Sequence, residues 1–236
     1  MSERIAAGTL EALARLDTCA VANAIETFGV RLRNEGFASP ALRCFTPQLP
    51  PVVGYAETLR VRSSSPPWER RFYADRTDWW SVLGDVPVPR ILVIQDVDPR
   101  VGVGAFVGGV HAHILRALGC VAVVTSGAVR DLPEVVEARL QLFAGNLSPS
   151  HAYVHVVDYG QPVQVAGLTV SPGDLLHADQ HGVVQVPATI AERIPAAARR
   201  LRQQEQRIRA FCRSRAFSLE GLRDLVAQDL PPGPQE

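Results

Sequence analysis

The spacing of apolar residues along this chain predicts where its helices and strands lie. Between residues 9 and 29, apolar residues recur at helical spacing in two short stretches, which predicts two helices with Thr9 and Asp17 as their N-caps. Residues 53–61 alternate between apolar and polar positions, which predicts a half-buried strand. A polar segment follows, and within it we predict a helix over about residues 68–83.

The middle of the chain has the pattern of a parallel crossover unit. Residues 91–94 and 121–124 are continuous apolar runs, as in strands that are covered on both faces. A glycine-rich stretch and a helix over 109–118 lie between them, and a second helix is predicted over 132–140. Strand, helix and strand at this spacing place the intervening loops at the carboxyl edge of a parallel sheet.

The last third of the chain changes to short apolar segments separated by glycine and proline. These predict strands that fold back over the crossover unit, at residues 142–144, 153–157, 163–165, 168–170 and 183–186. We therefore predict one compact α/β domain over residues 1–187. A charged helical extension over 188–226 would pack on this domain or on a neighbouring subunit, and residues 227–236 are predicted to be a disordered tail.

Composition narrows the classes of function. The 236 residues include 24 basic and 24 acidic side chains, so a nucleic acid or an anionic membrane surface is not an expected partner. No apolar run reaches the roughly 18 residues of a membrane span, and the polar N-terminus lacks a signal-peptide pattern. The four cysteines are scattered, which favours reduced thiols in a cytoplasmic protein.

The chain contains no lysine. Schiff-base chemistry needs an amine that can lose its proton, and arginine stays charged at working pH. Lysine-dependent aldolases, pyridoxal-phosphate enzymes and the lysine-containing P-loop are therefore excluded.

The strongest candidate site combines a glycine-rich loop with an Arg–Asp pair. Free backbone amides near Gly108 and Gly109 suit a carboxylate or phosphate. Gly127 is predicted to let the chain turn after the second buried strand and present Arg130 and Asp131 at the same sheet edge. Such a carboxylate suits a divalent metal, and the arginine suits an anion bound to that metal. The alternative is that Asp131 only caps the helix that follows it.

Other features of the sequence are weaker evidence for a functional site. The glycines do not match the spacing of a dinucleotide-binding loop. His151 and His155 are predicted on one face of a strand, and ordinary hydrogen-bonded roles are favoured for the histidine pairs. His111 is the exception because it lies beside the anion-binding loop. Trp79 and Trp80 are assigned to packing or to a subunit contact.

Four segments together resemble the RraA-like family, which includes 4-hydroxy-4-methyl-2-oxoglutarate aldolases and regulators of ribonuclease activity. They are LDTCAVANAIETF at residues 16–28, GAVRD at 127–131, SHAYV at 150–154 and PGDLLHAD at 172–179. The resemblance extends in order over residues 16–187. It implies a compact α/β fold with a β/β/α swivelling core, assembled as homotrimers or homohexamers with sites at subunit interfaces.

The resemblance also implies roles for individual residues. Aldolase members cleave 2-oxo acid aldols, and many decarboxylate oxaloacetate, with Mg²⁺ or Mn²⁺. Asp131 would be the metal ligand and Arg130 would bind the substrate. The residues that would hold the substrate carboxylate are Gly108, Gly109, Val110 and His111. A glutamate from the neighbouring subunit would match either Glu192 or Glu205.

This chain departs from the family pattern at three positions. Many members carry an acidic residue at the position of Gly109, where it helps to hold metal-bound waters, and asparagines at the positions of His111 and His113. Without lysine, a metal is the expected Lewis acid. The expected function is therefore a divalent-metal-dependent lyase that acts on a small 2-oxo acid through a pyruvate enolate. The alternatives are a non-catalytic regulatory binding protein, favoured by Gly109, and a different enzyme that uses His111 as an acid or base.

Overall fold

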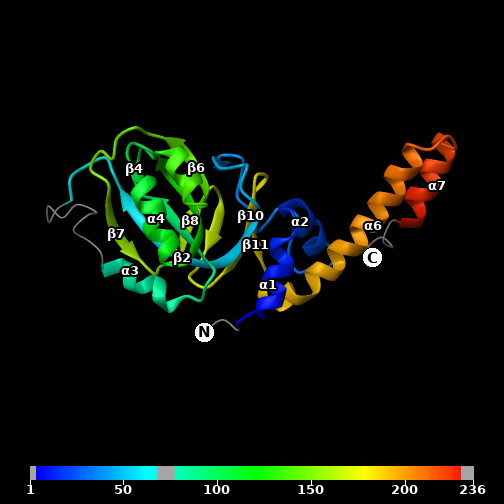
Figure 1. The fold of residues 1–236 in the computed structure, drawn as a ribbon, viewed down its shortest axis with the longest axis horizontal. Helices are drawn as coiled ribbons and strands as arrows, with labels where there is room; N and C mark the ends of the chain where they lie inside the picture. The colour runs from blue at the N-terminus through cyan, green and yellow to red at the C-terminus, as the bar shows by residue number, and fades with distance from the viewer. Residues whose placement is uncertain (1–3, 68–77, 230–236) are drawn as a thin grey trace.

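The computed structural model of the chain describes residues 4–67 and 78–229. Most of its strands form one mixed sheet in the order β1-β6-β5-β3-β2-β10-β11, with β4 added beside β5 and β7 beside β2 (Figure 1). β8 and β9 form a separate hairpin. The strands are β1 Arg43–Cys44, β2 Val52–Arg62, β3 Arg90–Asp96, β4 Ala105–Val107, β5 Cys120–Val129, β6 Gln141–Leu147, β7 His155–Tyr159, β8 Val163–Val165, β9 Leu168–Val170, β10 Leu175–Asp179 and β11 Gly182–Val186.

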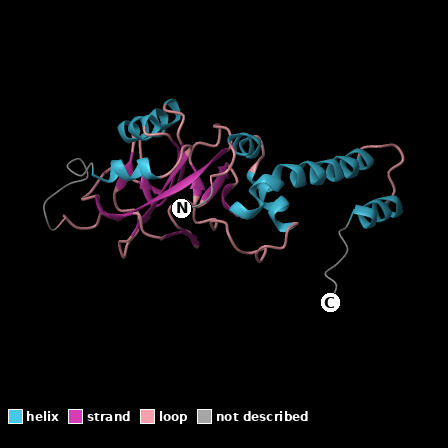
Figure 2. Ribbon diagram, turned by 90° about the horizontal axis from the view of Figure 1, so that it is seen from below, coloured by secondary structure: helices cyan, strands magenta, loops and turns pink. Residues whose placement is uncertain are grey.

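Helices lie on the faces and at one end of this sheet (Figures 1 and 2). The α-helices are α1 Ala7–Ala14, α2 Thr18–Glu26, α3 Asp78–Val82, α4 Gly109–Ala117, α5 Leu132–Glu137, α6 Ile194–Cys212 and α7 Leu219–Asp229. Among the described residues, the 3₁₀ segment η2 Leu83–Asp85 joins α3 to the sheet, and the 3₁₀ segment η3 Ala188–Arg193 precedes α6. No helix among the described residues is both long and apolar enough to cross a membrane.

The predicted crossover unit is confirmed as the centre of the sheet. β2, β3, β5 and β6 are neighbours and run parallel, and α4 connects β3 to β5 through β4. The apolar run at residues 91–94 of β3 is fully buried, because both faces of the sheet are covered. α4 and α5 cover one face, and the β8–β9 hairpin covers the other. A further apolar cluster joins α1, α2 and the start of α6 to the β10–β11 end.

Several local predictions were wrong because contacts distant in the sequence decide them. β2 is buried on both faces rather than half-buried, since the β8–β9 hairpin covers the positions that alternate with its apolar ones. Thr9 lies inside α1, which begins after Ala6 and has no side-chain cap. Asp17 is confirmed as the cap of α2, because its carboxylate accepts a hydrogen bond from the amide of Ala20 at 2.8 Å.

The predicted boundaries also change around the glycine-rich stretch and in the last third. β5 continues to Val129, so Gly127 lies within a strand and makes no turn. Residues 105–107 form β4 instead of loop, and β10 at residues 175–179 is a strand that was not among those predicted for the last third of the chain. Residues 78–82 of the predicted 68–83 helix form α3, whereas residues 68–77 lie outside the described part of the chain.

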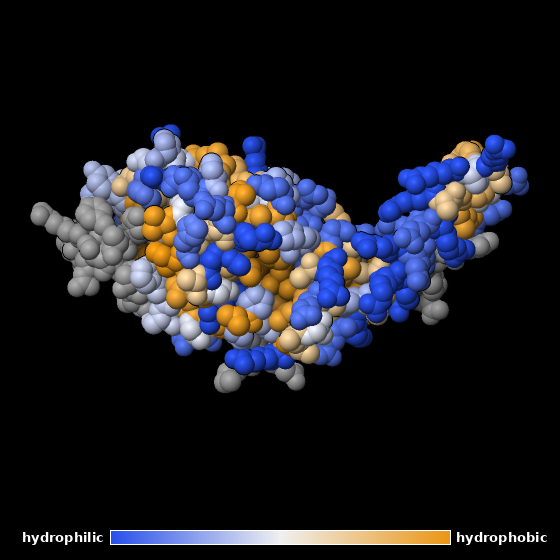
Figure 3. All heavy atoms as spheres, viewed as in Figure 1, coloured by the Kyte–Doolittle hydropathy of each residue, from blue (hydrophilic) through white to orange (hydrophobic). Residues whose placement is uncertain are grey.

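The C-terminal extension packs on the domain only at its beginning. Buried Ala197 and Ala198 of α6 face the apolar cluster shared with α2, and the rest of α6 projects away with α7 folded back at its end (Figures 1 and 2). The visible face of the projecting part is largely hydrophilic, with an apolar patch beside α7 (Figure 3). Residues 227–229, predicted to begin a disordered tail, are part of α7, and residues 230–236 lie outside the described part.

One buried carboxyl group makes stability depend on pH. Glu57 of β2 is 2% exposed; its Oε1 accepts a hydrogen bond from the amide of Thr58, whereas its Oε2 has no partner among the described residues. Burial raises the pKa of this carboxyl. The pKa of Glu57 is therefore higher in the folded chain than in the unfolded chain, where it is about 4.3. Glu57 favours the folded state fully at pH values below the unfolded pKa. This contribution is lost as the pH rises through the folded pKa.

We predict that Glu57→Gln raises the melting temperature at pH 8, because glutamine has the shape of the protonated carboxyl and carries no charge. A gain of about 1 kcal/mol corresponds to roughly 2–4 °C for a chain of this size. Thermal unfolding at pH 8 and pH 4.5 would measure the effect, which should shrink at the lower pH. The exposed Glu137→Gln is the matched control, and an equal gain in both variants would contradict the prediction.

Candidate functional site

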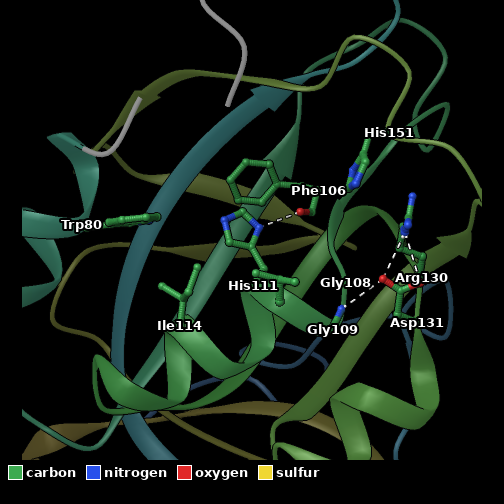
Figure 4. A pocket seen from close by; sticks show the side chains of 10 residues that line it. Trp80, Phe106, Gly108, Gly109, His111, Ile114, Arg130, Asp131 and His151 are labelled. Carbon is green, nitrogen blue, oxygen red and sulfur yellow. Dashed lines mark hydrogen bonds and ion pairs between the residues drawn. The ribbon is translucent and has the colours of Figure 1, made fainter. Parts of the chain in front are cut away.

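A cavity of about 310 Å³ lies between the start of α4 and the end of β5 (Figure 4). All the site residues predicted from the sequence border it: Gly108, Gly109, Val110, His111, Arg130 and Asp131. Trp80, Phe106, Ile114 and His151 complete its wall. The structure therefore brings the two halves of the predicted site together at one place.

Parallel pairing of β4 with β5 produces this convergence. The two strands end side by side, and the amide of Arg130 donates a hydrogen bond to the carbonyl of Val107 at 3.0 Å. β4 leads directly into α4 and β5 leads directly into α5. The predicted loop of free amides is in fact the first turn of α4, with Gly108 at its N-cap position. First-turn N–H groups have no carbonyl four residues earlier within the helix, and the positive end of the helix dipole attracts anions.

Asp131 does not cap its own helix, so the alternative role considered for it was wrong. It occupies the N-cap position of α5 with φ 54° and ψ 47°, a left-handed conformation, and its side chain makes no cap hydrogen bond. Its Oδ2 instead accepts a hydrogen bond from the amide of Gly109 at 3.2 Å. A left-handed conformation is uncommon for a residue other than glycine, although aspartate is among those that tolerate it. The backbone thus turns this carboxylate away from α5 and toward α4.

The carboxylate of Asp131 is ionised and closely held. The Gly109 amide, followed by the guanidinium of Arg130, lowers the pKa of Asp131. Nε of Arg130 lies 3.2 Å from both carboxylate oxygens, and its Nη1 donates to the carbonyl of Pro149 at 3.1 Å. The two side chains are 31% and 37% exposed, and ion pairs this accessible contribute little stability. Their main effect is to fix the orientation of the two charged groups beside the cavity (Figure 4).

The two glycines are required by close packing. A Cβ atom on Gly108 would lie 2.6 Å from Oδ2 of Asp131, and one on Gly109 would lie 2.7 Å from Cβ of Glu134. Glu134 of α5 therefore occupies the space beside Gly109, where many relatives are expected to carry an acidic side chain. An acidic side chain at position 109 would require Glu134 to move. The glycine at this position is therefore consistent with the way α5 packs on α4.

The two histidines of α4, His111 and His113, differ in burial and in their position relative to the cavity. His111 is buried in α4, and its Nδ1 lies 2.8 Å from the carbonyl of Phe106. A carbonyl only accepts hydrogen bonds, so Nδ1 carries the proton; burial lowers the pKa of this imidazole, which is neutral near pH 7. His113, two residues further along α4, is exposed and does not border the cavity.

His151, like the wall residues Trp80, Phe106 and Ile114, was not predicted as a site residue. It precedes β7 rather than sharing a strand face with His155, and its Nδ1 donates to the carbonyl of Ala105 at 2.7 Å. Its imidazole borders the cavity on the same side as Arg130 and Asp131 (Figure 4). The available signal was its place in the SHAYV segment, which carried the family resemblance. His177, by contrast, is a buried core histidine bonded to Thr18 and Leu13.

Comparison of the chain with known proteins identifies its family. The model of the RraA-like family, described as Aldolase/RraA, matches residues 18–185. The chain belongs to the RraA-like family. The predicted α/β fold class is confirmed by this match and by solved structures of similar shape.

Two solved structures show how far the RraA-like fold extends over the chain. RraAS2 from Streptomyces coelicolor, described as an unusual member of the RNase ES inhibitor RraA protein family, has a TM-score of 0.68 at 25% identity, over 89% of this chain and 99% of that one. An uncharacterized protein from Pseudomonas syringae pv. tomato has a TM-score of 0.71 at 23% identity, over 95% and 96% of the two chains. The second likeness shows the fold alone.

A sequence relative covers less of the RraA-like chain. An uncharacterized protein of Methanocaldococcus jannaschii is 27% identical over 120 residues, which is 50% of this chain and 56% of that protein. The match therefore spans little more than half of that relative's length. Family membership rests on the longer match to the family model.

We predict that Gly108→Ala raises the pKa of Asp131 toward its ordinary value. Gly108 has φ −140°, which any residue adopts, so the new methyl group adds no backbone strain. It would lie 2.6 Å from Oδ2 of Asp131 and 3.1 Å from Cγ of Arg130, and would displace the carboxylate from the Gly109 amide. Carbon-13 NMR titration of the side-chain carboxyl measures this pKa. Gly8→Ala in α1 is the matched control, because nothing lies within 4 Å of the added methyl. An unchanged Asp131 pKa in Gly108→Ala would contradict the prediction.

Proposed function

We propose that this RraA-like chain is a divalent-metal-dependent carbon–carbon lyase, which cleaves or decarboxylates a small 2-oxo acid through a pyruvate-like enolate. The observation that carries the proposal is the ionised Asp131 carboxylate, fixed by the Gly109 amide and Arg130 at the edge of a cavity. The absence of lysine removes the Schiff-base route to the same enolate. The formal net charge of zero agrees with a small-molecule substrate in the cytoplasm rather than a nucleic acid or membrane partner.

Asp131 fits Mg²⁺ or Mn²⁺ that keeps most of its waters. The described residues contain no group of three or more His, Cys, Asp or Glu that could enclose a metal ion. Mg²⁺ commonly binds proteins through one or two carboxylates, with water and substrate oxygens completing its shell. Asp131 would supply that carboxylate. When bound, the metal would supply Lewis acidity to the 2-oxo group.

The other residues of the cavity have complementary tasks under this proposal. The guanidinium of Arg130 would bind the substrate oxygens and stabilise negative charge as the enolate forms. The first turn of α4, from Gly108 to His111, would hold the substrate carboxylate at the positive end of the helix, through amides other than that of Gly109, which donates to Asp131. His151 borders the same end of the cavity and could move a proton to or from the substrate carbon. His111 is less suited to acid–base work because it is buried and packs against Phe106 and Trp79, whereas His151 is only partly buried.

We also propose that the chain acts as a homotrimer or homohexamer. The family implies a glutamate for which Glu192 and Glu205 are the two candidates. Glu192 is exposed, Glu205 is half-buried, and neither borders the cavity of its own chain. Glu205 is paired with Arg209 on α6. Under this proposal a glutamate from this region would complete the site of a neighbouring subunit. Glu205 lies on α6, whose later turns project away from the domain (Figure 1).

A non-catalytic regulatory role is the second candidate. It is favoured by Gly109, which lacks the acid expected of aldolase members, and by the likeness to RraAS2, described as belonging to an RNase ES inhibitor family. A regulator would bind its protein partner whether or not residue 131 carries a charge. The substitution that tests the lyase therefore also separates the two roles.

We predict that the chain releases pyruvate from oxaloacetate, or from 4-hydroxy-4-methyl-2-oxoglutarate, in a reaction that requires Mg²⁺ or Mn²⁺ and stops with chelator. Asp131→Asn should lower kcat/KM by about 100-fold or more, because the amide neither carries charge nor binds the metal well. A coupled pyruvate assay measures the rates. Asp158→Asn is the matched control, since Asp158 is paired with Arg60 away from the cavity. Metal-independent turnover, or full activity in Asp131→Asn, would contradict the proposal.

A further inference from the structure

The cavity has two chemically different ends. Arg130, Asp131 and His151 lie at one end, and Trp80, Phe106 and Ile114 gather toward the other (Figure 4). The apolar side chains come from three separate elements, α3, β4 and α4. A substrate whose 2-oxo acid head lies at the charged end must place its remaining part against this apolar wall.

The apolar wall is built of rings that support one another. Trp79 is 2% exposed and lies behind the wall; its ring centroid is 6.1 Å from that of Trp80 at 72°, and 5.9 Å from that of Phe106. The imidazole of His111 lies 4.9 Å from Phe106 and 6.2 Å from Trp79. Trp79 is therefore a packing residue, as predicted, whereas Trp80 borders the cavity. Rings held at these distances and tilts form a shaped surface rather than a loose one.

The described part of the chain places no permanently charged group at the apolar end of the cavity that could pair with a second carboxylate. Among the described residues that border the cavity, Arg130 is the only permanently charged cation, and it is tied to Asp131 at the opposite end. His111 is neutral, because burial lowers its pKa. The indole Nε1 of Trp80 is buried, so this side chain offers carbon atoms to the cavity. A distal carboxylate would lose water without gaining a charged partner from the described wall residues, which is unfavourable.

We propose that the substrate is a 2-oxo acid that carries an uncharged aryl group, with its ring against Trp80, Phe106 and Ile114. The volume of about 310 Å³ lies at the lower end of the roughly 300–1,000 Å³ usual for small-molecule sites, which leaves room beyond a three-carbon head. Aromatic walls favour an aryl group over an alkyl group of similar size, because tilted ring contacts add to the burial of apolar surface. The inference rests on the proposed function for the position of the 2-oxo acid head.

The aldol of this class is a 4-aryl-4-hydroxy-2-oxobutanoate. In its cleavage the C3–C4 bond breaks and its electron pair stays on C3, which becomes the pyruvate enolate. The 4-hydroxyl loses its proton as C4 becomes the carbonyl carbon of an aryl aldehyde. A proton added to C3 then gives pyruvate, so atoms and charges balance without an oxidant or reductant.

Binding of unreactive ligands to the whole chain tests the inference separately from turnover. Calorimetric titration in the presence of Mg²⁺ should give phenylpyruvate a Kd at least tenfold lower than that of 2-oxoglutarate, which has a carboxylate where phenylpyruvate has a ring. Ile114→Arg should reverse this order by placing a cation at the apolar end. Trp80→Ala should weaken phenylpyruvate about tenfold and leave oxalate unchanged. Phe217→Ala, which removes an exposed ring on the C-terminal extension, is the control.

Equal or tighter binding of 2-oxoglutarate by the unsubstituted chain would overturn the aryl inference. So would a preference for phenylpyruvate that survives both Ile114→Arg and Trp80→Ala. Failure of the lyase proposal has a different signature, namely no pyruvate from 4-hydroxy-4-phenyl-2-oxobutanoate or oxaloacetate while phenylpyruvate still binds at the Trp80 wall. If pyruvate is released from oxaloacetate but phenylpyruvate has no advantage, the lyase stands and the aryl inference is wrong.

Discussion

The hydrogen bond from the Gly109 amide to the Asp131 carboxylate is the contact on which the site depends. It joins the start of α4 to the start of α5, and therefore the ends of β4 and β5. It is possible only because Asp131 adopts a left-handed backbone conformation and leaves its own helix uncapped. A strained residue that gives up a local hydrogen bond is a common feature of functional sites, where surrounding contacts sustain the strain. Here those contacts are the Gly109 amide and the guanidinium of Arg130.

Steric demands around this bond explain why the chain has two consecutive glycines. Gly108 leaves room for the carboxylate of Asp131, and Gly109 leaves room for the side chain of Glu134. The residue that looks like a missing acid in the sequence is thus part of a different packing of α5 on α4. Among the described residues this packing leaves one carboxylate at the cavity, that of Asp131, which suits a weakly enclosed, hydrated cation better than a preformed metal cage. The end of the cavity away from Arg130, Asp131 and His151 is lined by Trp80, Phe106 and Ile114, and the proposed specificity beyond the 2-oxo acid head rests on that asymmetry.

The sequence predicted the parallel centre of the fold and the residues at its carboxyl edge, because both follow from local patterns. Continuous apolar runs identified β3 and the start of β5, and the GAVRD segment identified Arg130 and Asp131. It could not predict that β2 is covered on both faces, since the β8–β9 hairpin that covers it lies about a hundred residues further on. His151 and Trp80 were missed as wall residues for the same reason, because each reaches the cavity from an element distant in the chain. The spacing of residues also cannot predict the left-handed backbone conformation of Asp131, because that conformation depends on the hydrogen bond with the amide of Gly109.

A crystal structure with Mn²⁺ and oxalate would test the central claim most directly, since oxalate has the chelating atoms of a 2-oxo acid and Mn²⁺ can be located by its anomalous scattering. The account predicts one Mn²⁺ bound to the carboxylate of Asp131, with oxalate between Arg130 and the first turn of α4. Mn²⁺ bound elsewhere, or oxalate in the cavity with the Asp131 carboxylate still bonded only to Gly109 and Arg130, would contradict it.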